Sequence, residues 1–191
     1  MELSNSSNNR TALLIIDMIS DFEFEDSELL IKHAMPVAKN IAALKKRANE
    51  AHIPVIYVND NYGKWQSDFR HLVAHCLEHD VKGRPIVEIL HPDEEKDYFV
   101  LKPKFSGFFA TPLNLLLEHL NVDTLILTGV AGNMCVLFTA NDAYMHDYKI
   151  YVPSDCTGSN TAEANTEALH LMQNVAKADI TPSVDLDLPL K

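Results

Sequence analysis

The sequence predicts an α/β domain of the three-layer α/β/α type, doubly wound and Rossmann-like, around a six-stranded and mainly parallel sheet. Short apolar runs rich in β-branched residues alternate with longer amphipathic stretches, which is the pattern of strand–helix units. The length of 191 residues fits one domain of about 100–200 residues. No internal repeat or linker divides the chain. We therefore expect a single domain over 1–191, with its core at about 11–180.

Six short runs are expected to form the sheet. The first, Thr11–Ile16, is apolar throughout, as a strand buried on both faces should be. The second, Ile53–Val58, has a proline near its start, where a strand tolerates it. The others are Tyr98–Leu101, Thr124–Thr128, Lys149–Val152 and Ala178–Ile180, the last followed by a loosely held tail over 184–191.

Five segments between the strands are predicted to be helical. Ala34–Ala51 repeats apolar residues at spacings of three and four. Ser67–Glu78 begins with serine, a residue type favoured at helix N-caps. A third helix is expected from Thr111 to about Leu120, with threonine as the cap and proline next. The others are Met134–Asp147 and Ala162–Ala176, whereas the charged stretch 81–97 is expected to be an irregular connection.

The charge and composition of the chain exclude several classes of partner. Lys and Arg number 16 and Asp and Glu number 27, which gives a formal net charge of −11. Such an acidic surface repels phosphate groups, so neither nucleic acid nor an anionic membrane is an expected partner. No apolar run approaches the roughly 20 residues that span a bilayer, and the first ten residues lack the apolar segment of a signal peptide. Three cysteines are too few for a disulfide framework, so we expect a reducing, cytoplasmic environment.

Reactive side chains follow three of the predicted strands. Asp17 ends the first strand, Lys102 ends the third, and Cys135 follows the fourth at the opening of a helix. Ligands of open parallel sheets bind beyond the carboxyl ends of the strands. Taken singly, these residues would be a turn former, a solvated charge and a core thiol. Together they form a nucleophilic set, because a helix start and a cation lower a thiol pKa, and a carboxylate can accept the thiol proton.

Blocks of sequence in a fixed order resemble the isochorismatase-like cysteine hydrolases, a family that includes nicotinamidases, carbamoylsarcosine amidases and isochorismatases. The resemblance covers roughly 11–180 and implies the isochorismatase-type fold. The matching blocks are Leu14-Ile-Ile-Asp-Met18 with Asp21-Phe22, Leu101-Lys-Pro-Lys-Phe-Ser-Gly-Phe108, Thr128-Gly-Val-Ala-Gly-Asn-Met-Cys-Val136, Thr139-Ala-Asn-Asp-Ala143 and Val152-Pro-Ser-Asp155.

The resemblance implies roles for individual residues. Asp17 would be the general base, Lys102 rather than Lys104 the catalytic lysine, and Cys135 the nucleophile. The Val130–Ala131 peptide bond would be cis, and the N–H groups of Ala131 and Cys135 would form an oxyanion hole. The implied activity is hydrolysis of an amide or other C–N bond of a small molecule through a cysteine thioester. A homodimer or larger homo-oligomer is also expected.

The sequence departs from the family at two places. Nicotinamidases hold a metal with an Asp-x-His pair and a further His, but here Asp60 is followed by Asn61 and Tyr62. No metal and no other cofactor is therefore expected. Ile19 stands where many relatives have Gln, so the resemblance does not name the substrate. Four residues near the expected cleft are predicted to contact the substrate: Phe22, Asn59, Trp65 and Phe108.

Alternatives to this interpretation remain. A vinyl-ether hydrolase of the isochorismatase type would use Asp17 and Lys102 without the thiol, and a non-catalytic binding protein would use none of them. Cys76 and Cys156 are expected to be packing residues. His71, His75 and His79 share one face of a helix at a spacing that can bind zinc, but we expect a solvated or interface face there.

Overall fold

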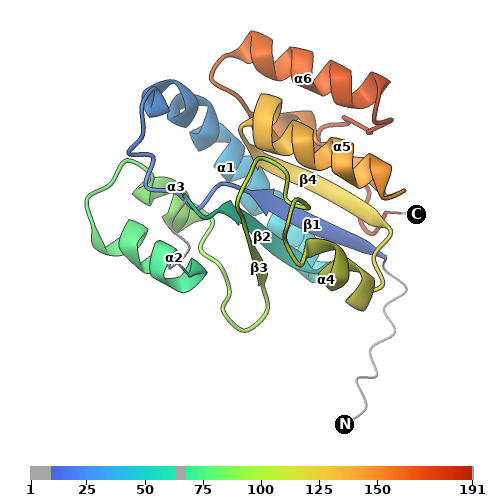
Figure 1. Cartoon of the computed structure of the whole chain (residues 1–191), viewed down its shortest axis with the longest axis horizontal. Helices are drawn as coiled ribbons and strands as arrows, with labels where there is room; N and C mark the ends of the chain where they lie inside the picture. The colour runs from blue at the N-terminus through green and yellow to red at the C-terminus, as the bar shows by residue number, and fades with distance from the viewer. Residues whose placement is uncertain (1–9, 63–67, 191) are drawn as a thin grey trace.

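A parallel sheet of six strands forms the centre of the molecule, with helices on both faces (Figure 1). The computed structural model describes residues 10–62 and 68–190. Five strands lie in the order β3-β2-β1-β4-β5, and β6 pairs with the end of β4. The predicted fold class is confirmed. The strands are β1 (Thr11–Ile16), β2 (Val55–Asp60), β3 (Tyr98–Lys102), β4 (Thr124–Val130), β5 (Lys149–Tyr151) and β6 (Thr157–Gly158).

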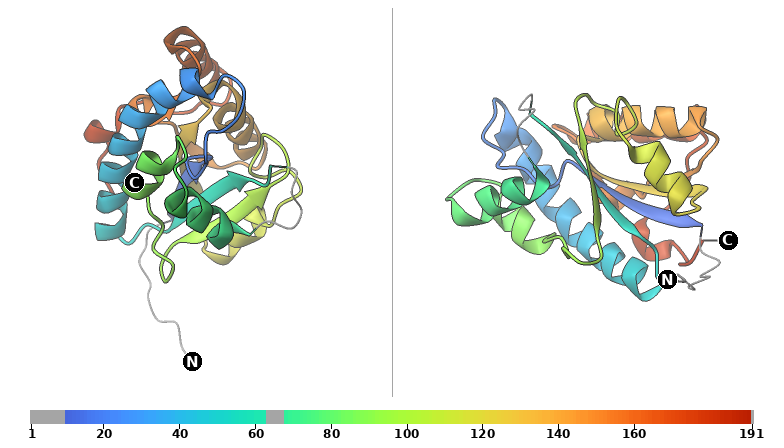
Figure 2. Two further views of the ribbon diagram at one scale, coloured as in Figure 1. Left: turned by 90° about the vertical axis from the view of Figure 1, so that its left-hand side faces the viewer. Right: turned by 60° about the horizontal axis from the view of Figure 1, so that its bottom comes forward.

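The helices divide into two layers, one on each face of the sheet (Figure 2). Successive side chains of a strand point to opposite faces, and β1 follows this rule: Leu13 and Ile15 join one core, Leu14 and Ile16 the other. The first layer holds α1 (Ser27–Glu50), α2 (Phe69–Glu78) and α3 (Arg84–Ile89), and the second holds α4 (Leu113–His119), α5 (Leu137–Met145) and α6 (Ala162–Asn174). Within residues 10–62 and 68–190, no helix combines the length and apolarity that a membrane span needs.

The observed secondary structure corrects several predictions. The stretch 81–97 is not wholly irregular, because it contains the short helix α3. The cap of α2 is Asp68, whose carboxylate accepts the His71 N–H at 2.7 Å, while Ser67 lies outside the described residues. The sixth strand is β6 rather than Ala178–Ile180, where a single bridge joins Asp179 to β5.

Two further segments differ from the prediction. The helix expected over Met134–Asp147 is divided into a π-helical turn, η1 (Gly132–Val136), and α5. The tail is docked over part of its length rather than loosely held. The Arg47 guanidinium donates hydrogen bonds to the carbonyl oxygens of Ser183 and Leu186, and the Leu186 side chain is buried.

Gly129 brings β4 against β1 at the point where both strands end. Its φ of 113° lies in the region that side-chain-bearing residues avoid, and a Cβ there would lie 2.0 Å from the Ile16 carbonyl oxygen. We expect Gly129→Ala to lower the free energy of unfolding by about 2 kcal/mol or more, measured by urea denaturation. Gly158→Ala is the control, because its Cβ would meet no atom closer than 3.4 Å. Equal losses in the two variants would contradict this account of Gly129.

Candidate active site

Asp17, Lys102 and Cys135 meet where β1, β3 and β4 end. Lys102 Nζ lies 2.8 Å from Asp17 Oδ2 and 3.4 Å from Cys135 Sγ. The Lys102 side chain is fully buried and that of Asp17 is nearly so. The structure therefore brings together the three residues that the sequence selects as a nucleophilic set.

The backbone where β1 ends turns the Asp17 side chain into this cluster. Asp17 has a φ of 52°, a left-handed conformation that Asp tolerates better than most residues. Its N–H donates to the Val58 carbonyl oxygen at 2.9 Å, and its Oδ1 accepts the Asp60 N–H at 2.7 Å. Two hydrogen bonds to β2 thus hold Asp17 in place, one from its backbone and one to its carboxylate. The other carboxylate oxygen faces Lys102.

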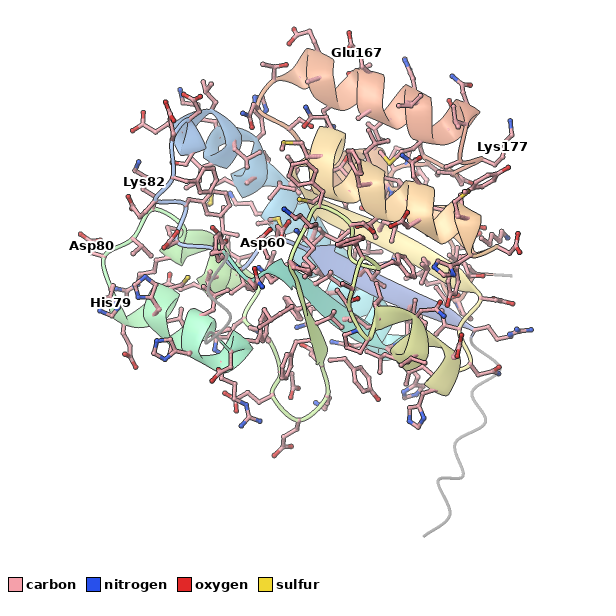
Figure 3. The ribbon with its side chains drawn as sticks, viewed as in Figure 1. Asp60, His79, Asp80, Lys82, Glu167 and Lys177 are labelled. Carbon is pink, nitrogen blue, oxygen red and sulfur yellow. The ribbon has the colours of Figure 1, made fainter. Side chains whose placement is uncertain are left out.

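Asp60 is a member of the cluster that the sequence analysis does not select. Its Oδ2 lies 3.4 Å from Lys102 Nζ, and Figure 3 labels it at the end of β2. The ammonium group also contacts the Lys104 carbonyl oxygen at 3.2 Å. The rule that found Asp17 would have found Asp60, because both carboxylates stand where a strand ends.

Burial is the largest single effect on the pKa of each of the three groups. The pKa of Asp17 is raised by burial, against the opposing effect of the Lys102 charge. The pKa of Cys135 is raised to about 12 by burial and by the Asp17 charge, again opposed by Lys102. Burial disfavours the charge on Lys102 as well, but nearby groups, the Asp17 carboxylate foremost, raise its pKa overall.

The expectation of a lowered thiol pKa is therefore wrong. It considered the helix start and the cation, whereas desolvation and the neighbouring carboxylate outweigh them. Burial and the Asp17 charge therefore favour the protonated thiol, which is hydrogen-bonded to the Asp17 carboxylate.

Cys135 lies in η1 rather than in the first turn of an ordinary α-helix. The Ala131 carbonyl oxygen accepts the N–H groups of Met134 at 3.0 Å and Val136 at 3.2 Å. The Val130–Ala131 peptide bond is cis, as the resemblance implies. The assignment of the Ala131 and Cys135 N–H groups to an oxyanion hole stays a prediction.

Thr139 links the turn that carries Cys135 to the chain that follows Lys102. Its hydroxyl donates to the Cys135 carbonyl oxygen at 2.7 Å and accepts the Gly107 N–H at 3.0 Å. Three of the blocks that carry the resemblance are thereby joined.

The residues predicted to contact the substrate lie in different places. Phe22 is buried in the core on the α1 side of the sheet, whereas Cys135 packs on the α5 side. Asn59 is fully buried, and its amide donates to the Ile19 carbonyl oxygen at 2.6 Å. Phe108 stacks on His146 at the far end of α5 from Cys135. Trp65 lies outside the described residues.

Tyr62 is a further residue at the site that the sequence analysis does not select. Its N–H donates to Asp60 Oδ1 at 2.6 Å, and its hydroxyl hydrogen-bonds with the Ser20 side chain. Desolvation and the charges of nearby carboxylates, Asp17 and Asp60 among them, raise the pKa of the Tyr62 hydroxyl. Its position in the sequence, two residues after the aspartate that ends β2, could have indicated that Tyr62 lies near the site.

The residues present do not fit a nicotinamidase-type metal site. In the described part of the chain, no group of three or more His, Cys, Asp or Glu side chains could hold a metal ion. Asp60 faces the Lys102 ammonium instead. The ring of His75, on α2, lies 4.7 Å from the ring of His79 in a tilted arrangement, and His75 Nε2 lies 3.7 Å from Asp21 Oδ2.

Comparisons with known proteins agree on one family. A family model of the isochorismatase domain matches residues 11–181. An uncharacterized isochorismatase family protein of Bacillus subtilis, YaaI, is 46% identical over 89% of this chain and 92% of its own. A probable inactive nicotinamidase of Arabidopsis thaliana is 32% identical over 86% of this chain and 89% of its own. The crystal structure of a pyrazinamidase/nicotinamidase from Streptococcus mutans superposes with a TM-score of 0.69, at 31% identity, over 89% of this chain and 99% of that one.

Replacing Lys102 should destabilise the protein in a pH-dependent way. Lys102→Met leaves the buried carboxylate of Asp17 without its cation, so we expect a loss of about 3 kcal/mol at neutral pH. It also removes the charge that holds down the pKa of Asp17, so that pKa rises further. The folded state then takes up a proton more readily than the unfolded chain, and the deficit should shrink as the pH falls through the pKa of Asp17.

The measurement is urea denaturation of Lys102→Met and the parent at several pH values. Lys104→Met, the same change at an exposed neighbour, is the control. A deficit that stayed constant or grew toward acidic pH would count against the ion pair as its cause.

Proposed function

This chain belongs to the isochorismatase family, and on that premise we propose that it is a cysteine hydrolase that cleaves an amide or other C–N bond of a small molecule through a thioester on Cys135. The observation that carries the proposal is the position of the Cys135 sulfur, 3.4 Å from the Lys102 ammonium and hydrogen-bonded to Asp17. A base and a cation that converge on one thiol supply what a cysteine nucleophile requires.

In the proposed reaction, Asp17 takes the proton from Cys135 and the thiolate attacks the carbonyl carbon. The N–H groups of Ala131 and Cys135 hold the oxyanion. As the C–N bond breaks, Asp17 returns the proton to the leaving amine, and the acyl group remains on sulfur. Asp17 then takes a proton from water, whose oxygen attacks the thioester carbon. As the C–S bond breaks, the acid is released and Asp17 returns that proton to the Cys135 sulfur, which restores the thiol and the carboxylate.

The raised pKa of Asp17 suits both halves of this cycle. A carboxylate in a desolvated site is a stronger base than one in water, so it can accept a thiol proton. Lys102 stabilises the thiolate that forms, because its ammonium touches the sulfur. The proton stays on Asp17 until an amine leaves.

The surroundings of Lys102 favour a neutral amide over a substrate that carries carboxylates. An ammonium group has three N–H donors, and four acceptors already lie within 3.4 Å of Lys102 Nζ: the carboxylates of Asp17 and Asp60, the Lys104 carbonyl oxygen and the Cys135 sulfur. The amidase activity named for the Streptococcus mutans relative agrees with this choice. Isochorismate, a dicarboxylate cleaved at a vinyl ether, fits the same surroundings less well.

Replacing the nucleophile tests the proposal. In a hydrolysis screen of small amides, ureides and isochorismate, we expect turnover of an amide that falls at least about a thousandfold in Cys135→Ala, with an unchanged melting temperature. Hydroxylamine should intercept the acyl group on sulfur as a hydroxamate. Cys156→Ala, which removes a thiol that lies elsewhere, is the control and should retain turnover. Cleavage of isochorismate by Cys135→Ala would establish the vinyl-ether activity instead, and a parent protein without any turnover would leave a binding protein.

Replacing the base should separate thiol reactivity from turnover. Asp17→Asn removes a negative charge that raises the pKa of Cys135 and leaves the Lys102 charge that lowers it. The pH profile of Cys135 alkylation by iodoacetamide should therefore move to lower pH by about one unit or more. Turnover should nevertheless fall about a thousandfold, because the proton acceptor and donor is lost.

Alkylation is assigned to Cys135 by peptide mass spectrometry, since the chain has two other thiols. The control is Asp21→Asn, which removes a carboxylate that raises the pKa of Cys76. A Cys135 profile that moved to higher pH in Asp17→Asn would refute the role assigned to the carboxylate.

A further inference from the structure

Ser159 holds one peptide group of the nucleophile turn. Its side chain is buried, with 1% of the residue exposed, and its Oγ accepts the Asn133 N–H at 3.1 Å. Asn133 belongs to η1, the same turn as Cys135. The Ser159 hydroxyl therefore fixes the direction of a backbone amide beside the nucleophile.

Asn165, in the first half of α6, determines which way the Ser159 hydroxyl points. Asn165 Nδ2 lies 3.2 Å from the Thr157 carbonyl oxygen, and Asn165 Oδ1 lies 3.1 Å from Ser159 Oγ. A carbonyl oxygen only accepts hydrogen bonds, so the amide nitrogen faces Thr157 and the amide oxygen faces Ser159. Ser159 then donates its single proton to Asn165 and keeps its lone pairs for the Asn133 N–H.

These hydrogen bonds run from Thr157 through Asn165 and Ser159 to Asn133. The Thr157 end is held in the sheet, and the other end packs closely against the loop. Thr157 lies in β6 and pairs with Gly129 of β4, just before the nucleophile loop begins. At the other end, a Cβ on Gly132 would lie 2.3 Å from Asn165 Oδ1 and 3.0 Å from Ser159 Oγ. Glycine at this position therefore permits the Asn165 amide to press against the backbone of the loop.

We propose that Asn165 is a positioning residue for the hydrolysis, acting through Ser159 on the Asn133 peptide group. This inference rests on the proposed function, because the loop that it orders carries Cys135 and the N–H groups assigned to the oxyanion. Amide donors stabilise an oxyanion only when their directions are fixed before the reaction. The hydrogen bonds of the Asn165 side chain go to Ser159 and Thr157 and not to the Cys135 sulfur, so its loss should disturb the loop and leave the proton chemistry of the thiol unchanged.

The kinetic test compares Asn165→Ala and Ser159→Ala with the parent on the amide that the parent hydrolyses. Each variant should lower kcat by about tenfold or more and change KM by less than about twofold, because the loop acts on the transition state. The rate and pH profile of Cys135 alkylation should stay those of the parent. The kcat of the double variant should be no lower than that of the less active single variant, because the two residues act in series.

Thr166→Ala is the matched control on α6. Its hydroxyl donates to the Ala162 carbonyl oxygen within the same helix, so kcat should not change. Ser159→Ala removes a single oxygen and decides the question alone if Asn165→Ala does not fold. An unchanged kcat in Ser159→Ala, or alkylation that slows in step with kcat, would overturn the inference.

A second measurement separates this inference from the proposed function. The exchange of the Asn133 amide hydrogen with solvent should speed up by about tenfold or more in Asn165→Ala and stay unchanged in Thr166→Ala. If the parent shows no Cys135-dependent hydrolysis, the hydrolase proposal fails, and this exchange rate alone judges whether Asn165 orders the loop. If hydrolysis is present and the exchange rate does not change, the positioning role fails and the hydrolase proposal stands.

Discussion

The buried ammonium group of Lys102 is the constraint on which the rest of the site depends. A charge without access to water is costly unless opposite charges and hydrogen-bond acceptors surround it. In the strand order of this sheet, β2 and β1 lie between the strand that carries Lys102 and the strand that precedes Cys135. Asp60 and Asp17, at the ends of those two strands, supply the compensating carboxylates. The need to neutralise one cation thus ties four strand ends to a single point.

The same constraint explains how the thiol is controlled. A thiolate beside Lys102 would be stabilised by the ammonium, but Asp17 already occupies that position as the anion. The negative charge of Asp17 raises the pKa of the Cys135 thiol, which favours the neutral form of the sulfur. In the proposed reaction, this pair would keep the nucleophile in its neutral form until the proton moves from sulfur to oxygen.

Much of this arrangement could be predicted from the sequence, because the rule for strand ends in parallel sheets is topological. It selected Asp17, Lys102 and Cys135 without any knowledge of their packing. The same rule could not place Phe22 in the core or Phe108 against the far end of α5. The sequence around an aromatic loop residue does not indicate the face of the sheet on which that residue packs.

Short elements were missed for a different reason. Helix α3 and strand β6 are too short for hydrophobic periodicity to be visible, and the chain of contacts through Asn165 depends on β6. The direction in which the pKa of Cys135 shifts could not be predicted either, because desolvation depends on residues that are distant in the sequence.

The high pKa of the Cys135 thiol has a consequence for how such a protein is found in a cell. Chemical surveys of the proteome rank cysteines by their labelling with haloacetamide probes at neutral pH, which reports the thiolate already present. Because burial and the Asp17 charge raise the pKa of the Cys135 thiol, we expect slow labelling of this residue in such a survey. Electrophiles that draw a proton as they react, such as nitriles or aldehydes, are the reagents suited to reveal it.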